Sequence, residues 1–325
     1  MPAGLLEHDG MMYTGATPWH GLGVKLDSPA TAAEAIAAAG LDWDVIQKDV
    51  YTRDTLGGFR AIPNKKAIVR EDTDEVFAVM GSGYTPTQNR DAAGPMMDGV
   101  IALGEAVYET AGSLFNGRRI FLLAKLPNEI TINRDDVVQP YILLSNSHDG
   151  TTALRMQLTP IRVVCWNTMS AALRGTSKGF YAKHTRNILS RAAEARDILG
   201  LADAYYQMFA RQADQMLNTR LTVIEVQDYL QRVYEFKPDK TYADQDHRVK
   251  AAYETTIDLL SHPTNTLGGM QGTAWAAWNA VTYYVDHERV VRGASDQRDD
   301  KRLDASWFGS GADIRQRAYD LLVPA

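Results

Sequence analysis

The spacing of hydrophobic and polar residues changes near residue 187. Before it, short runs rich in β-branched and aromatic residues alternate with turn residues, and this pattern predicts strands at 44–51, 59–62, 66–70, 76–80, 106–113, 118–124, 141–145 and 153–158. Gly57-Gly58 and Asn116-Gly117 are typical hairpin turns. The connections are too short for helical crossovers, so we expect a mostly antiparallel sheet.

Helical spacing dominates the rest of the chain. Apolar residues recur three and four positions apart at Ile198, Leu201, Tyr205, Phe209 and Met216, and shorter helices are predicted at 222–234, 246–260, 272–290 and 312–322. Before residue 187, helices are predicted up to Gly40, over 88–103 and over 167–173. We therefore predict an α+β fold, with a mixed α/β domain over 1–187 and a helical region over 188–325.

Composition narrows the class of protein. Hydrophobic residues make up 45% and charged residues 23% of 325 positions, which are ordinary globular values. The sequence has no apolar run long enough for a transmembrane helix, and its first residues do not resemble a signal peptide. The single Cys165 excludes an internal disulfide and a multi-cysteine zinc site. These features predict a soluble, intracellular protein that has no contact with a membrane.

Charge is unevenly distributed along the chain. Residues 151–191, here called the basic segment, contain seven Lys and Arg and no acid; since the net charge is -6, the rest carries -13 (+7 - 13 = -6). Such a segment predicts a polyanion site, although its cations could instead pair with acids elsewhere in the fold. Aromatic residues within it would stack on unpaired bases while the cations neutralise phosphates. The predicted nucleic-acid-binding residues are Arg155, Arg162, Arg174, Lys178, Lys183, Arg186, Arg191, Trp166 and Tyr181.

Motifs for other chemistry are incomplete. Gly-x-Gly occurs at 21–23, 81–83 and 309–311, but neither G-x-G-x-x-G nor a P-loop is formed. The seven His residues are scattered, and the adjacent Ser147, His148 and Asp149 predict a turn because neighbouring positions cannot form a triad. We predict no catalytic residue, no metal and no cofactor, while an enzyme assembled from dispersed residues stays open.

One helical stripe suggests self-association. Trp275, Trp278, Asn279, Thr282 and Val285 share one face of the predicted helix at 272–290. The aromatic surface of this helix face is larger than a small helical domain needs for its own core. We therefore expect a homo-oligomer.

Several long motifs resemble a known family. GYTPTQN at 83–89, ETAGSLFNGRRIFLLAKLP at 109–127, SNSHDGTTALRMQLTPIRVVCWNT at 145–168 and GTAWAAWNAVTYYVDHERVVRG at 272–293 resemble the phage/plasmid-like protein family, whose function is unknown. The resemblance implies a mobile-element origin and location in the host bacterial cytoplasm.

Together with the basic segment, this origin suggests a phage-encoded single-stranded DNA-binding protein, and more specifically an ATP-independent single-strand annealing recombinase. The alternative is a phage protein-interaction module that binds or inhibits a host protein.

Overall fold

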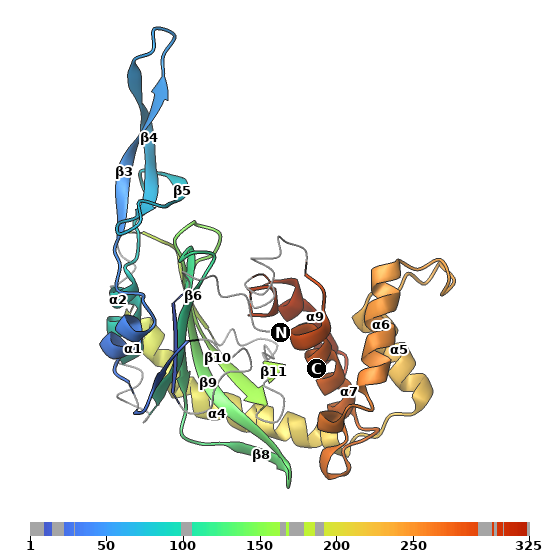
Figure 1. Ribbon diagram of the computed structural model, residues 1–325. Helices are drawn as coiled ribbons and strands as arrows, with labels where there is room; N and C mark the ends of the chain where they lie inside the picture. Colours follow the sequence, from blue (N-terminus) through green and yellow to red (C-terminus); the bar gives the residue numbers. More distant parts are fainter. Residues whose placement is uncertain are drawn as a thin grey trace. The chain divides into compact units, whose positions relative to one another are not determined.

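The computed structural model describes residues 10–14, 23–28, 30–98, 106–162, 167–168, 179–185, 192–291, 301, 304–307 and 309–323 (Figure 1). The chain forms two compact units, and neither is one continuous segment. Unit 1 comprises Met1–Pro127, Tyr141–Leu158 and Gly179–Leu201, and unit 2 comprises Asn128–Pro140, Thr159–Lys178 and Ala202–Ala325. The two units therefore interleave along the chain, whereas the sequence suggested one boundary at residue 187.

Unit 1 is built around a mostly antiparallel sheet, which confirms the predicted fold class. Its strands run in the order β2-β1-β6-β7-β9-β10, and β12 also pairs with β10. The pairing of β1 with β2 is parallel, and the registers of β1 with β6, β6 with β7, and β7 with β9 are antiparallel. The strand bounds are β1 Met11–Thr14, β2 Val24–Leu26, β6 Val107–Leu114, β7 Arg119–Lys125, β9 Asp136–Ser147, β10 Leu154–Arg162 and β12 Gly179–Ala182. Residues 136–140 of β9 and 159–162 of β10 belong to unit 2.

A second antiparallel sheet in unit 1 contains β3 (Val45–Arg53), β4 (Phe59–Arg70) and β5 (Val76–Gly81). In Figure 1 the hairpin of β3 and β4 continues well past the end of β5. The register changes between Asp49↔Lys66 and Tyr51↔Ala61, so β4 carries extra residues in a bulge where Asn64 has a φ of 57°. We call residues 51–61, beyond this bulge, the distal arm.

The helices of unit 1 follow local sequence signals. In α1 (Ala32–Ala38), the side chains of Thr31 and Glu34 cap each other's backbone amides, and Gly40 follows the helix with a φ of 62°. The helix predicted over 88–103 is present as α2 (Asn89–Asp91) and the π-helix η1 (Ala92–Asp98). Residues 99–105 lie outside the described part of the chain.

Unit 2 is largely helical, as predicted for the C-terminal region. The helix α4 (Ala192–Asn218) begins in unit 1. The short strands β8 (Ile130–Asn133) and β11 (Asn167–Thr168) pair with those residues of β9 and β10 that belong to unit 2. The helix predicted over 167–173 is wrong at its first two residues, because these pair with the end of β10; residues 169–173 lie outside the described residues. The remaining helices are α5 Val223–Val233, α6 His247–Leu259, η3 Pro263–Asn265, η4 Leu267–Gly269, α7 Ala274–Tyr283, η5 Tyr284–Glu288 and α9 Ser310–Asp320.

The aromatic stripe of α7 forms the core of unit 2. Trp275 and Trp278 are fully buried, and their ring centroids each lie 6.3 Å from that of Phe209. The Trp278 ring also lies 5.2 Å from Tyr319, and Trp275 Nε1 donates a hydrogen bond of 2.8 Å to Oδ2 of buried Asp136. Unit 2 itself therefore covers both rings, so the sequence argument for a homo-oligomer does not hold. No helix in the described part of the chain combines the length and apolar character needed to cross a bilayer.

The two tryptophans provide a matched test of this core. Trp275→Phe removes a short hydrogen bond to a buried carboxyl group, whereas Trp278→Phe removes a longer contact of 3.4 Å to the Arg315 carbonyl. Because the bond to the buried Asp136 carboxyl group is the shorter of the two, we expect Trp275→Phe to lower the free energy of unfolding by about 1 kcal/mol more than Trp278→Phe. Urea denaturation measures this difference, and equal losses would contradict the assigned role of Asp136.

Candidate nucleic-acid interface

Part of the basic segment forms the outward face of two neighbouring strands. The antiparallel register places Arg155 of β10 directly opposite Tyr181 of β12. Because side chains alternate between the faces of a sheet, these two point away from the core, while their neighbours point into it. The buried neighbours are Leu154, Met156, Phe180 and Ala182.

The outward pair combines a cation with an aromatic ring. The guanidinium carbon of Arg155 lies 5.6 Å from the centroid of the Tyr181 ring, within the range of a cation–π interaction. The ring is 47% exposed and lies close over Gly179, where an added Cβ would come within 2.9 Å of it. Lys183, directly after β12, is also exposed. We call Arg155, Tyr181 and Lys183 the strand face.

The structure describes the side chains of only these three of the nine predicted binding residues. Arg162 ends β10 opposite Asn167 of β11, and its side chain lies outside the described part. The other five residues, together with Cys165, also lie outside the described residues: Trp166, Arg174, Lys178, Arg186 and Arg191.

A buried hydrogen-bond network lies directly beside the strand face. We call residues 84–89 the connector. The carbonyl of His184, next to Lys183, accepts from the Thr85 amide at 3.2 Å, and His184 Nδ1 lies 3.3 Å from Thr87 Oγ1. His148, which directly follows β9, places its Nε2 2.9 Å from Asn89 Oδ1. The connector is thus joined to the ends of β9 and β12.

The same connector holds the base of the β3–β4 hairpin. Gln88 makes two hydrogen bonds of 2.9 Å with the backbone of Val45, accepting from its amide and donating to its carbonyl. Gln47 Nε2 donates to the Tyr84 carbonyl at 2.8 Å. The first residues of β3 and the residue that follows Lys183 are therefore attached to one six-residue segment. Sequence reasoning missed this arrangement because its partners lie far apart along the chain.

The two buried histidines have a packing role. His148 lies between Trp43 and Phe77, at ring-centroid distances of 5.3 and 5.8 Å, and burial lowers its pKa to about 3. Burial also lowers the pKa of His184, although the Thr152 backbone and Asp149 partly oppose this shift. Both rings are therefore neutral near pH 7. The predicted turn after Ser147 is confirmed, with Gly150 at a φ of 72°.

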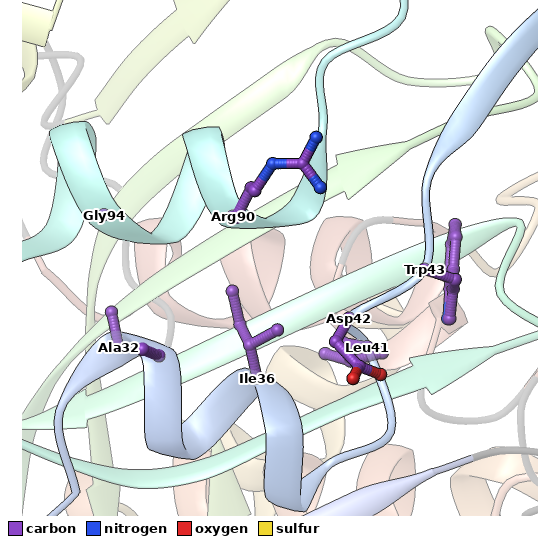
Figure 2. A pocket seen from close by; sticks show the side chains of 8 residues that line it. Ala32, Ile36, Leu41, Asp42, Trp43, Arg90 and Gly94 are labelled. Atoms are coloured by element: carbon purple, nitrogen blue, oxygen red, sulfur yellow. The ribbon is translucent and has the colours of Figure 1, made fainter.

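Two cavities among the described residues are weaker candidates for a ligand-binding site than the strand face. The first, of about 280 Å³, lies between α1 and the segment that carries Arg90 and Gly94; its lining is largely apolar, and Arg90 is paired with Asp44 (Figure 2). The second, of about 980 Å³ in unit 2, is lined by three Arg and three acidic residues, so its charges balance. Within the described residues, no group of three or more potential ligands is placed to hold a metal ion.

The described residues thus define an α+β protein whose clearest chemical feature is a strand face on which the half-buried Arg155 and the exposed Lys183 accompany an exposed aromatic ring. Residues 76–307 match the family described as a domain of unknown function (DUF932). This match covers most of the chain, and the protein therefore belongs to that family. No curated protein and no solved structure matches the chain significantly. The strands β3 and β4 precede the matched residues.

The neutral state of His148 predicts a pH-dependent stability. In the unfolded chain its imidazole titrates near the ordinary pKa of 6.5, whereas in the fold it stays neutral down to about pH 3. The unfolded state binds more protons in this interval, so the free energy of unfolding falls as the pH decreases through it, by at most about 1.4 kcal/mol per pH unit for one histidine.

Urea denaturation at about pH 7.5 and about pH 5 tests this expectation, because His148→Gln should show a smaller decrease than the wild type. The surface variant His247→Gln provides the control for loss of an exposed imidazole. Equal decreases in the wild type and His148→Gln would contradict the buried neutral ring.

Proposed function

We propose that the protein binds single-stranded DNA through the strand face, with little sequence preference and without ATP or a metal ion. The observation that carries the proposal is the Arg155 guanidinium over the exposed Tyr181 ring, with Lys183 close by in sequence. Cations neutralise phosphates, and an exposed ring stacks on a base with a contribution of about 1–3 kcal/mol. The absence of acidic residues from 151–191 supports the same partner.

The exposed ring favours a single strand over a duplex. In a duplex the bases already stack on one another, so a ring on a sheet surface finds no free base face. Proteins that read duplexes directly usually insert a helix or ribbon into a groove, whereas Tyr181 projects from the broad face of a sheet. The single strand is therefore the partner that uses both the ring and the cations.

The biological step is part of the proposal. The resemblance to phage/plasmid-like proteins supports an origin in a bacteriophage, prophage or plasmid, and such elements often encode their own annealing recombinases. An ATP-independent annealing protein needs a surface that holds one strand by its backbone and bases without reading sequence. The strand face has the residue types for this task.

Fluorescence anisotropy of a labelled oligo-dT strand, measured over a series of salt concentrations, tests the proposal. Lys183→Gln should reduce the magnitude of the log–log salt slope by about 0.7, and removing Lys178 and Arg186 as well should reduce it by about 2. Tyr181→Ala should weaken binding by about tenfold or more with little change in slope, because stacking releases few counterions.

Lys240→Gln is the matched control, because Lys240 is an exposed cation in unit 2 and outside the basic segment. It should leave both affinity and slope unchanged. A wild-type protein that does not bind the strand at low salt ends this proposal, and so does equal affinity for a blunt duplex. If the wild-type protein does not bind the strand at low salt, a host protein becomes the leading candidate for the binding partner.

A further inference from the structure

The distal arm exposes large apolar side chains that unit 1 leaves uncovered. Tyr51 is 55%, Phe59 75% and Leu56, at the turn, 96% exposed. A two-stranded hairpin is only marginally stable in water, and these side chains add little to any core. Exposed aromatic residues on such an element indicate a contact with a partner.

Cations accompany these rings in a defined register. Arg53 pairs with Phe59 and Thr52 with Arg60, so Tyr51, Arg53 and Phe59 lie on one face of the hairpin. The guanidinium carbon of Arg53 lies 5.8 Å from the Phe59 centroid. This is the same combination as on the strand face, namely an arginine beside an exposed ring on the neighbouring antiparallel strand.

The distal arm and the base of the hairpin differ in how their charged side chains are paired. Towards the base, Lys48 pairs with Asp74, and Lys66 pairs with Asp49 at 2.7 Å. In the distal arm the single acid is Asp54, whose Oδ1 accepts from the amides of Leu56 and Gly58 at 2.9 and 2.8 Å and so closes the turn. Among the described residues, no acid pairs with Arg53 or Arg60. The distal arm therefore has a net positive charge and exposed rings, which complements a nucleic acid.

We propose that the distal arm is a second contact for the same single strand that binds the strand face. This inference rests on the proposed function. The connector supports it, because Tyr84 accepts from Gln47 at the base of the hairpin, while Thr85 donates to His184 beside Lys183. One short segment thus holds both surfaces within unit 1. Two linked contacts raise affinity only for a strand long enough to reach both.

The test compares an oligo-dT of about 6 nucleotides with one of about 40, a range that spans common binding-site sizes. The double variant Tyr51→Ser/Phe59→Ser should bind the long strand about tenfold or more weakly than the wild type and should reduce the preference for length. Arg53→Gln/Arg60→Gln should reduce the magnitude of the salt slope for the long strand by about 1.4.

Ile224→Ser, at an exposed apolar residue of α5, is the control and should bind as the wild type does. Thermal unfolding checks that the arm variants are folded, which is expected because their side chains project from the hairpin into solvent. If Tyr181→Ala weakens binding but both arm variants bind both strands normally, the arm contact is overturned and the proposed function stands.

Failure of the wild type to bind either strand overturns the proposed function, and the arm contact with it. Arm variants that bind DNA normally but alter the molecular mass in light scattering show that the arm contacts protein, which also overturns the inference.

Discussion

The arrangement of unit 1 depends on the hydrogen bonds of the connector, which range from buried to exposed. Its side chains and backbone join three elements that are distant in sequence: the start of β3, the residue after β9 and the residues after β12. Buried polar groups without partners cost more than such bonds contribute when formed, so loss of either group in the buried pairs His148–Asn89 and His184–Thr87 would be costly. Burial, and not the hydrogen bond to Asn89, keeps the His148 ring neutral. The connector therefore fixes both the base of the arm and the end of the strand face.

Much of the secondary structure was predictable because its signals are local. The capping pairs Thr31–Glu34 and Thr222–Glu225 mark helix starts within four residues of sequence. The interleaved units and the connector were not predictable in this way, because His148 and Asn89 are 59 positions apart and leave no periodic pattern. Periodicity also placed Trp275 and Trp278 on one face without showing that unit 2 covers them.

The candidate site was predictable only where its signal is local in the sequence. A run without acids identified the basic segment, but no strand was predicted over residues 179–182. Only the structure shows β12 there, with Tyr181 exposed and Phe180 buried. The distal arm was not predicted as a binding surface, because residues 44–75 contain acids and cations together. Only the structure shows that Asp49 and Asp74 pair with lysines at the base, while Arg53 and Arg60 have no such partner in the described residues.

We propose that a single strand of DNA lies on the strand face. Photo-crosslinking of the wild-type protein to an oligonucleotide containing 4-thiothymidine, followed by mass spectrometry of the crosslinked peptides, measures this directly. We expect adducts in the peptide that contains Tyr181, and in peptides from residues 51–61 when the strand is long. Adducts confined to residues 202–323, or no adducts under conditions of binding, would contradict it.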